Sequence, residues 1–489
     1  MTRLSNRTLA NLPSNIARPA YDRANVKVGV VHLGVGAFQR SHAAEYFDSI
    51  LNSDLNWGII GASLRKPGTR DALAPQDFLY SHVIRSGGGT EIKVIGSLLN
   101  VLDATTQRDE LMAAMTNPDV RIVSLTVTEK GYCHDPATGK LDRNHPDVLH
   151  DLARPEAPIS AIGLLVRALE LRFAHSVAPF TVLCCDNLPS NGETVARVVA
   201  EFAALRSEAL AKQIAQKVTF PSTMVDRIVP ATTDEDRSLV AERLGLEDAW
   251  PVVTEPFTQW VIEDRFCAGR PDFEKVGVQL VSNVKPFEHM KLRMLNGSHS
   301  TLAYLGYLAG YDYVAQAIAD PAFHKLIYAL MTDEVMPTLP SGLGDLGAYR
   351  DALLERFANA ALKHRTWQIA MDGSQKLPQR LLGTMRDRLA SGQPIHRLSL
   401  GVAAWMRYVT GIDEKGTAID VRDPFAQRLR AIADNAGKDH QKLAHGLLQV
   451  KEIFGEDLPQ NQIFIAELEG QLHALFAKGA RQTVQDLPV

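Results

Sequence analysis

The sequence predicts an α/β protein in which a doubly wound parallel sheet is followed by a mostly α-helical domain. Three observations predict this architecture. Short apolar runs alternate with helical patterns in the first half of the chain. A glycine-containing turn directly follows the first of these runs. After about Pro286, long amphipathic segments replace the short runs.

The apolar runs of the first half predict buried parallel strands. They cover residues 28–33 (VGVVHL), 57–61 (WGIIG), 121–127 (RIVSLTV) and 180–185 (FTVLCC), and a helix over 41–51 is expected after the first run. Strands that are apolar throughout and separated by helices are typical of β-α-β units, in which helices cover both faces of the sheet. The first half therefore predicts a doubly wound sheet.

The second half predicts helices. Asp320 and Pro321 form a typical helix start, and apolar residues follow them at helical spacing, so this stripe is expected to face a core. The change of pattern places a domain boundary near residue 285. We therefore expect two domains, 1–285 and 286–489.

The composition is that of an ordinary globular protein. The 489 residues are 45% hydrophobic and 22% charged, with a net charge of -4, so neither nucleic acid nor an anionic membrane is expected as a partner. We find no run of about 18 apolar residues that would predict a membrane span. The N-terminal stretch MTRLSNRTLANLPSN lacks the apolar core of a signal peptide. We expect a cytoplasmic protein.

The cysteines predict neither disulfides nor a metal centre. The four residues are Cys133, Cys184, Cys185 and Cys267, and no CxxC pair is among them. Without the ligand spacing of a zinc site, we expect buried, reduced thiols and no bound metal.

A glycine turn follows the first predicted strand. In Gly34-Val-Gly36-Ala-Phe38-Gln39-Arg40 the two glycines would let the backbone approach a pyrophosphate, and the start of the next helix would favour its negative charge. This predicts a Rossmann-like, dinucleotide-binding turn. Gln39 stands where the third glycine of the usual pattern would be, and a tight turn without a ligand would have the same sequence.

The loop after the second predicted strand leaves the cofactor open. An acid at this point normally binds the ribose 2′-hydroxyl of NAD. Here the loop carries Arg65 and Lys66 instead, and Asp71 is the nearest carboxylate. Two cations would accept the 2′-phosphate of NADP, but a solvated basic loop has the same composition. We expect NAD, with NADP as the alternative.

Polar residues follow two further strands. Asp186 and Asn187 come directly after the run 180–185, and Thr128 follows the run 121–127. In an open α/β sheet, ligands bind beyond the carboxyl ends of the strands. Because Asp and Asn are also common turn formers, an ordinary turn remains the alternative at the first corner.

The segment KLRMLNGSH predicts a catalytic helix. Lys291, Asn296 and His299 lie at positions i, i+5 and i+8. On an α-helix they would project at roughly 0°, 140° and 80°, which is one broad face. A desolvated lysine serves as a base when its pKa approaches neutrality, and an asparagine amide serves as a donor to an alkoxide. The alternative is an amphipathic helix with a snorkelling lysine and a hydrogen-bonded histidine.

The sequence resembles the polyol-specific long-chain dehydrogenases, the mannitol dehydrogenase family. The motif K-x-R-x-L-N-G-S-H is similar to that family's signature. So are HLGVGAFQRSH, SLTVTEKGYC, CDNLPSNGE, FPSTMVDRIVP, EPFTQWVIED and DGSQKLPQR, which occur in the family's order over nearly the whole chain. The resemblance implies a Rossmann-like domain, a mostly helical domain and a site between them that works without metal.

The resemblance also implies roles for particular residues. Lys291 would be the general base, Asn187 and Asn296 the oxyanion donors, and His299 would position the substrate oxygen. The expected binding residues fall into two groups. The cofactor residues are Gly34, Gly36, Phe38, Arg40, Arg65, Thr128 and, in a second role, Asn187. The substrate residues are Lys376, Asp226, Glu288 and Arg293.

Two departures from the family pattern leave the substrate open. Pro67 and Gly68 stand where mannitol 2-dehydrogenases tend to have an acid, and Gln368 stands where some carry an arginine, eight residues before Lys376. The segment around Gln368 also resembles the fructuronate reductase branch. By contrast, RDALAPQDFLY resembles the mannitol branch.

The leading expectation is therefore oxidation of D-mannitol to D-fructose, or of a close polyol such as D-arabinitol. The alternative is reduction of D-fructuronate to D-mannonate, whose carboxylate Arg293 or Lys376 would bind, unless these cations sit in structural ion pairs. A non-catalytic sugar-binding protein would not need the lysine base. The resemblance and the lack of coiled-coil heptads imply a monomer or a weak oligomer.

Overall fold

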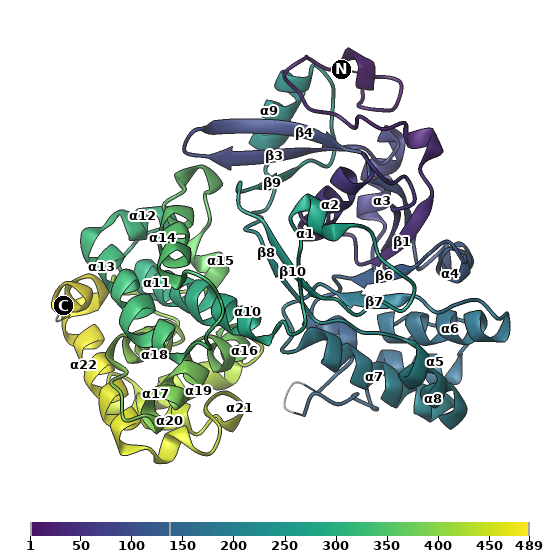
Figure 1. Cartoon of the computed structure of the whole chain (residues 1–489). Coiled ribbons are helices and arrows are strands. Elements are labelled where there is room, and N and C mark those ends of the chain that lie inside the picture. Colours follow the sequence, from purple (N-terminus) through teal and green to yellow (C-terminus); the bar gives the residue numbers. More distant parts are fainter. Residues whose placement is uncertain (1, 136–137, 488–489) are drawn as a thin grey trace. The chain divides into compact units, whose positions relative to one another are not determined.

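The chain forms two compact units. The structure, a computed structural model, describes residues 2–135 and 138–487. The units comprise Met1–Lys285 and Pro286–Val489 (Figure 1). Each unit has hydrophobic clusters of its own, and each is described here by itself.

The N-terminal unit is built on a five-stranded parallel sheet. Its strands, in spatial order, are β5 (Leu98–Asp103), β2 (Gly58–Ser63), β1 (Val28–Leu33), β6 (Ile122–Leu125) and β7 (Thr181–Cys184). The order of the strands reverses between β1 and β6. In sheets of this kind the reversal opens a crevice at the carboxyl ends of the strands, where ligands bind. The predicted doubly wound sheet is confirmed.

Helices cover both faces of this sheet. Val31 and Leu33 belong to one hydrophobic core with α6 and α7, whereas Val30 belongs to another core with α2. Successive strand residues point to opposite faces, so a strand buried on both sides must be apolar at every position. The helices of this unit are α1 (Ala37–Ser41), α2 (Ala43–Ile50), α3 (Gly68–Leu73), α4 (Arg108–Thr116), α5 (Pro146–Ala153), α6 (Ala161–Ala174), α7 (Asn191–Arg206), α8 (Glu208–Lys217) and α9 (Asp234–Leu244).

The helix expected over 41–51 is divided in the structure. His42, with φ −122° and ψ −87°, separates α1 from α2. Its ring stacks on Phe38 with centroids 5.0 Å apart, and its Nε2 lies 2.9 Å from the carbonyl oxygen of Gln259. These long-range contacts coincide with the kink, and a local apolar pattern does not contain them.

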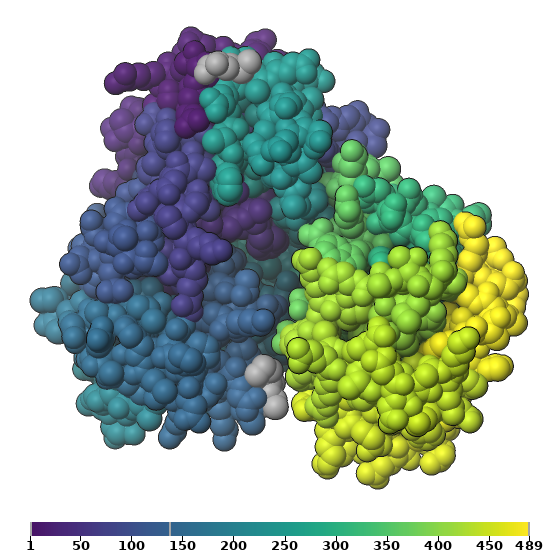
Figure 2. Space-filling view, turned by 180° about the vertical axis from the view of Figure 1, so that it is seen from behind, coloured from purple at the N-terminus to yellow at the C-terminus, as the bar shows by residue number. Residues whose placement is uncertain are grey.

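Two small sheets complete the unit, and the apolar pattern did not predict them. In spatial order they consist of β11 (Gln279–Val281), β10 (Gln259–Glu263) and β8 (Thr223–Asp226), and of β4 (Gly89–Ile95), β3 (Tyr80–Ser86) and β9 (Val252–Thr254). The N-terminal segment lies beside residues near 247, where the Leu4 amide donates to the Glu247 carbonyl oxygen at 2.9 Å. Purple and teal surfaces adjoin there in Figure 2.

All named elements within residues 286–487 are helical, as predicted. The α-helices, of which the first begins at Lys285, are α10 (Lys285–Met290), α11 (Ser298–Leu308), α12 (Val314–Ala319), α13 (Pro321–Ala329), α14 (Leu346–Phe357), α15 (Thr366–Ala370), α16 (Gly373–Leu377), α17 (Gly383–Ala390), α18 (His396–Tyr408), α19 (Ala426–Ala436), α20 (His440–Leu448), α21 (Lys451–Phe454) and α22 (Gln462–Gln485). The predicted start at Asp320 is confirmed, since its side chain accepts from the Ala322 amide at 2.9 Å. Helices α11, α18 and α22 pack together. Among the helices of the described chain, none combines the length and hydropathy that a bilayer-spanning segment requires.

Candidate active site

The glycine turn after β1 has the geometry that a dinucleotide requires. Gly34 has φ +94°, and a Cβ there would lie 2.2 Å from the carbonyl oxygen of Thr126, so only glycine fits. Gly36 is the N-cap of α1, and a Cβ there would meet nothing closer than 4.0 Å. A tight turn followed by an open approach to backbone N–H groups suits a pyrophosphate. The residues present therefore fit a dinucleotide cofactor.

The buried side chain of His32 stabilises this turn through hydrogen bonds. The Nδ1 of His32 lies 2.8 Å from Ser124 Oγ, and its Nε2 lies 2.8 Å from Thr126 Oγ1. Because the Thr126 hydroxyl donates its proton to the Gly34 carbonyl oxygen at 2.8 Å, it accepts from Nε2–H, and Nδ1 accepts from Ser124. Burial lowers the pKa of His32 to about 3, so the ring is neutral. The one histidine in the apolar run VGVVHL was the signal for this role, which the sequence reasoning missed.

The side chain of Asp186, which directly follows β7, binds the loop after β6. Asp186 Oδ2 accepts from the Val127 amide at 2.8 Å and from the Tyr132 hydroxyl at 2.6 Å. Burial, the largest influence, raises the pKa of Asp186 to about 6. Thr128 has φ 65° and ψ 164°, a conformation that non-glycine residues rarely adopt. The contacts of Asp186 on either side of Thr128 hold the loop in this strained form.

Asn187 is exposed on the same corner. Behind it the buried Asn191 donates from Nδ2 to the carbonyl oxygens of Cys184 and Thr223, at 3.2 and 3.0 Å, and accepts from the Thr223 amide at 2.9 Å. These bonds join the end of β7 to β8. Asp226 is buried at the last position of β8. Asn187 thus lies in a loop that the hydrogen bonds of Asn191 hold in place.

Two predicted cofactor residues are engaged in internal contacts. Arg40 is only 4% exposed, and its Nη1 donates to the Trp250 carbonyl oxygen at 2.5 Å. The guanidinium also lies over the ring of Tyr80, 5.1 Å from the ring centroid. Arg65 forms an ion pair with Asp147. These contacts give Arg40 a structural role beneath the turn, and a contact of either arginine with a cofactor stays a prediction.

The segment that carries the lysine is a π-helix rather than the expected α-helix. The π-helix η6 (Lys291–Gly297) continues directly into α11. A π-helix bonds i to i+5, so its turn is wider and the projection angles for an α-helix do not hold. The three predicted catalytic residues of this unit are buried: Lys291 is 6%, Asn296 9% and His299 6% exposed. Single π-turns of this kind occur frequently at functional sites.

A glycine allows η6 to pack closely on a second π-helix, η10 (Pro378–Leu382). A Cβ on Gly297 would lie 2.7 Å from the carbonyl oxygen of Arg380. The Arg380 side chain donates from Nη1 to Ser300 Oγ at 3.0 Å, in the first turn of α11. The two irregular segments therefore fix each other in place.

The surroundings of His299 are partly aromatic and strongly basic. Its ring stacks on Phe357 with centroids 5.1 Å apart and meets the His364 ring edge-on at 4.9 Å. Burial and, after it, His364 and Arg380 hold the pKa of His299 well below its usual range. His299 is therefore neutral. The sequence reasoning did not assign a role to His364 or to Arg380.

The predicted substrate residues of this unit differ in their surroundings. Lys376 Nζ donates to the carbonyl oxygens of Ile369 and Met371 at 3.3 and 2.5 Å. Glu288 is partly buried in α10, one turn before the lysine. Arg293 Nη1 pairs with Asp387 at 2.6 Å and donates to Thr338 Oγ1 at 2.9 Å. The ion pair expected as the structural alternative is present, and a contact of Arg293 with substrate stays a prediction.

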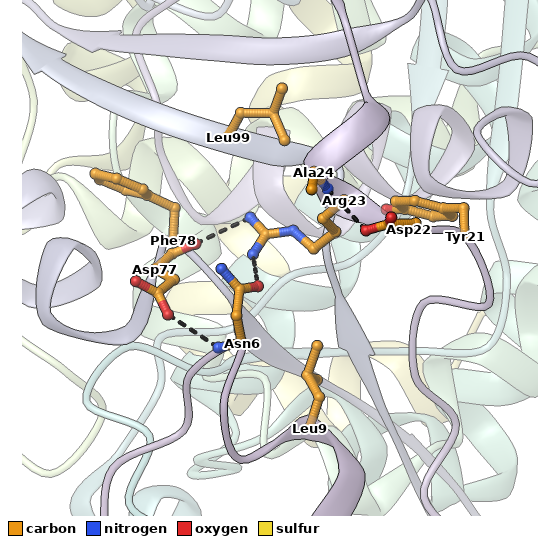
Figure 3. Close-up of a pocket in the computed structure, with 9 residues that line it drawn as sticks. All are labelled: Asn6, Leu9, Tyr21, Asp22, Arg23, Ala24, Asp77, Phe78 and Leu99. Atoms are coloured by element: carbon orange, nitrogen blue, oxygen red, sulfur yellow. Dashed lines mark hydrogen bonds between the residues drawn. The ribbon is translucent and has the colours of Figure 1, made fainter.

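A hollow on the N-terminal unit has a volume of about 560 Å³. Arg23 crosses it and binds Asn6 and, at 2.9 Å, the Asp77 carbonyl oxygen (Figure 3). A second hollow, of about 580 Å³, lies beside α22. Neither includes a predicted site residue, and Arg23 in the first is used to anchor the N-terminal segment.

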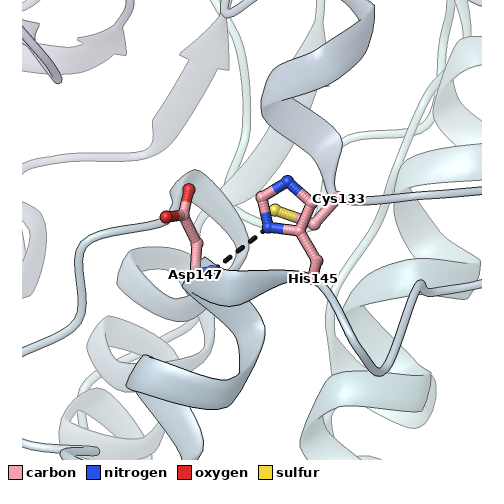
Figure 4. Close-up of side chains that lie close together, drawn as sticks. All are labelled: Cys133, His145 and Asp147. Atoms are coloured by element: carbon pink, nitrogen blue, oxygen red, sulfur yellow. Dashed lines mark hydrogen bonds between the residues drawn. The ribbon is translucent and has the colours of Figure 1, made fainter.

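The side chains of Cys133, His145 and Asp147 bring three potential metal ligands within 4.8 Å of one another (Figure 4). His145 and Asp147 already have structural uses. The His145 ring accepts from the Asp147 amide at 3.2 Å and caps α5, and the Asp147 carboxylate pairs with Arg65. Burial raises the pKa of the Cys133 thiol to about 12, which disfavours the thiolate that a metal binds. All four cysteines are free thiols; the expected burial is observed for Cys133, Cys184 and Cys185, whereas Cys267 is partly exposed.

Fold and site together define a class of protein. A parallel sheet with a glycine turn at its strand-order reversal is a dinucleotide-binding fold. A buried group of lysine, asparagine and histidine is suited to moving a proton at an alcohol oxygen. These features are those of a dehydrogenase that acts on a CH–OH group.

Comparison with known proteins gives the family. The Rossmann domain of mannitol dehydrogenase matches residues 28–275, and the mannitol dehydrogenase C-terminal domain matches residues 283–476. The chain belongs to the mannitol dehydrogenase family.

Relatives of both branches match over nearly their full length. D-mannonate oxidoreductase of Escherichia coli (strain K12) is 49% identical, over 98% of this chain and 99% of the relative. Mannitol 2-dehydrogenase of Phaeosphaeria nodorum is 42% identical, over 99% of this chain and 85% of the relative. The solved Pseudomonas fluorescens mannitol 2-dehydrogenase, a ternary complex with NAD and D-mannitol, superposes with a TM-score of 0.91 at 39% identity and covers 99% of both chains.

Proposed function

We propose that this protein transfers hydride between NAD and a secondary alcohol of a linear polyol or of the corresponding sugar acid, with Lys291 as the general base. The observation that carries the proposal is the buried group of Lys291 and Asn296 on the π-helix η6 and His299 at the start of α11, in a chain of the mannitol dehydrogenase family. The NAD complex of the P. fluorescens relative supports the cofactor. NADP stays the alternative.

The proposed chemistry needs one proton acceptor and donors to one oxygen. In the oxidative direction, Lys291 takes the hydroxyl proton while the carbinol carbon loses its hydride, and in reduction it returns that proton to the oxygen. NAD, when bound, supplies the hydride acceptor. Burial favours the neutral amine that a base requires.

Amide donors would stabilise the charge that develops on the substrate oxygen. In the proposal, the Nδ2 groups of Asn296 and Asn187 donate to this oxygen, and the neutral imidazole of His299 positions it. Lys376, Asp226 and Glu288 would bind the other hydroxyl groups of the substrate. Gly34 and Gly36 would hold the pyrophosphate, with Phe38, Arg65 and Thr128 along the same cofactor site.

Two substrate pairs remain candidates at this level. Relatives named mannitol 2-dehydrogenase support D-mannitol and D-fructose, with D-arabinitol as a close variant. The E. coli relative named D-mannonate oxidoreductase, at 49% identity, supports D-mannonate and D-fructuronate. Both pairs use the same base and the same hydride position, so the mechanism is common to them.

Substitution of the lysine tests the proposal. We expect Lys291→Ala to lower kcat by several orders of magnitude, because the base is lost, and to leave the Kd for NAD, measured by calorimetry, nearly unchanged. Lys275→Ala, which removes an exposed lysine paired with Asp272, is the matched control. Substantial activity in Lys291→Ala would exclude this residue as the base. So would an oxidative rate that stays flat between about pH 6 and 10, since a base must lose its proton to act.

A further inference from the structure

The arginines that follow β2 are already paired with carboxylates. Arg65, two residues beyond the end of β2, forms an ion pair with Asp147. Arg70 in α3 pairs with Asp71 at 2.7 Å and lies 3.7 Å from Asp103. In dinucleotide-binding sheets, residues at this strand end face the ribose that carries a 2′-hydroxyl in NAD and a 2′-phosphate in NADP. The ion pairs therefore affect which of the two cofactors this chain binds.

The pair of Arg65 and Asp147 connects the two sides of the crevice at which the order of the strands reverses. In the sheet, β1 lies between β2 and β6. Arg65 follows β2, whereas Asp147 comes from the part of the chain between β6 and β7. A carboxylate oxygen of Asp147 lies within 4.8 Å of Sγ of Cys133, which directly follows the 3₁₀-helix η4 (Glu129–Tyr132) after β6. The ion pair thus joins the segments that follow the two neighbours of β1.

Asp147 is held in place without the help of the arginine. It is the second residue of α5, after Pro146, and its amide donates to Nδ1 of His145 at 3.2 Å (Figure 4). The side chain of Asp147 is 12% exposed, against 64% for that of Arg65. Among the residues that the structure describes, Arg65 is the only cation in an ion pair with this carboxylate. The acid is therefore fixed, and only the arginine is free to move toward a ligand.

Transfer of Arg65 to a 2′-phosphate is unfavourable for two reasons. It would leave the largely buried Asp147 carboxylate without its cation, and a buried charge without a partner is destabilising. If the guanidinium bound both anions instead, it would bring the carboxylate and a phosphate with a charge of about −2 together, and like charges repel. Lys66, next to Arg65, is exposed and offers a hydrated point charge in place of the bidentate contact of an arginine. A ribose 2′-hydroxyl requires neither change.

We propose that Asp147 makes this chain select NAD over NADP, by holding Arg65 in an ion pair and withholding it from a 2′-phosphate. An acid in the loop after β2 usually makes this selection, and here the acid comes from a remote segment. Asp147 is thus a specificity-determining residue that needs no contact with the cofactor itself. The proposal rests on the proposed function above and adds the choice of cofactor to it.

Binding of the two cofactors to the wild-type protein is the first test. In calorimetric titrations, we expect the Kd for NADP to exceed that for NAD by roughly 10-fold or more, because the 2′-phosphate finds no free guanidinium. Similar Kd values, or tighter binding of NADP, would overturn the selectivity and leave the proposed hydride transfer intact. Binding of neither cofactor would overturn the proposed function as well.

The second test is Asp147→Asn, which keeps the shape of the side chain and removes the charge that holds Arg65. We expect the Kd for NADP to fall about 10-fold, the size of one hydrogen bond to a charged group, and that for NAD to change by less than about threefold. In an Arg65→Gln background the same substitution should lower the Kd for NADP by less than about threefold, since no guanidinium is released. Asp272→Asn, on an exposed acid paired with Lys275, is the matched control and should change neither Kd. No gain in NADP binding, or an equal gain with and without Arg65, would overturn the proposal.

A measurement on the wild-type protein decides the matter if Asp147→Asn does not fold. Adenosine 2′,5′-bisphosphate differs from AMP by the 2′-phosphate alone. In competition with NAD it should bind no more tightly than AMP, because Arg65 stays with Asp147. Tighter binding of the bisphosphate would show that a cation accepts the 2′-phosphate and would contradict the selection of NAD by this ion pair.

Discussion

Gly34 and Gly36 lie two residues apart in the same turn, but glycine is required at each position for a different physical reason. Gly34 has a positive φ and a neighbouring backbone oxygen within 2.2 Å of where a Cβ would be, so the fold itself demands glycine. At Gly36 a Cβ would enter open space. If the turn binds a pyrophosphate, Gly36 leaves room for the ligand, whereas Gly34 allows the backbone conformation of the turn.

Alanine substitutions separate these two requirements. Gly34→Ala should lower the free energy of unfolding by about 1–3 kcal/mol through strain and a backbone clash. Gly36→Ala should leave the urea midpoint unchanged within error and weaken NAD binding by roughly 10-fold, about 1.4 kcal/mol. Urea unfolding and calorimetric titration with NAD measure the two effects. Unchanged NAD affinity in Gly36→Ala would argue against a cofactor at this turn.

At the level of elements, the π-helix η6 is the feature that local periodicity did not anticipate. Its wider turn carries Lys291 and Asn296, and Gly297 lets it approach η10. An α-helix of the same sequence would aim these side chains differently. The positions of the two proposed catalytic side chains therefore depend on the packing of two irregular segments and not on the sequence spacing alone.

Gly297→Ala tests this dependence. The added Cβ would lie 2.7 Å from a backbone oxygen that cannot rotate away, so η6 and η10 must separate. We expect stability to fall by about 1–3 kcal/mol and kcat to fall at least 10-fold, with NAD affinity nearly unchanged. Gly470→Ala in α22, where a Cβ meets nothing within 4 Å, is the control and should be neutral or stabilising by up to about 1 kcal/mol. Full activity in Gly297→Ala would show that the close packing is dispensable.

Over the whole molecule, buried neutral histidines make stability depend on pH. Burial lowers the pKa of His32 and His82 to about 3 and that of His42 and His364 to about 4. Between these values and 6.5 the unfolded chain binds more protons than the folded one, so stability is complete above about pH 6.5 and is lost as the pH falls. Asp186, whose pKa burial raises to about 6, acts in the opposite direction over part of this range.

We therefore expect the free energy of unfolding to decrease between pH 6.5 and 4, by about 1.4 kcal/mol per pH unit for each such histidine, less the opposing contribution of acids such as Asp186. Urea unfolding at half-unit pH steps measures the slope. His82→Gln should reduce it by about one proton, whereas His445→Gln, on an exposed ring, should not. A urea midpoint that did not change between pH 6.5 and 4 would contradict the conclusion that these histidines are buried in their neutral form.

The sequence by itself determined the elements whose information is local. The run VGVVHL became β1 over the predicted residues, the other apolar runs became parallel strands within a few residues, and the second half is helical. Apolar periodicity specifies such elements because burial is decided side chain by side chain. The order of the motifs, through resemblance, indicated the family, which the comparisons confirm, and it supplied the catalytic set that is proposed here.

Only the tertiary structure decided which polar side chains meet. It placed Arg40 beneath the turn and Arg293 in an ion pair, bound Asp186 to a strained loop and brought His364 to His299 across 65 residues of sequence. These partners depend on distances between remote segments, which no local pattern contains. The π-helix η6, on which Lys291 lies, also depends on remote segments. It packs against η10, and helix propensity alone does not specify its wider turn.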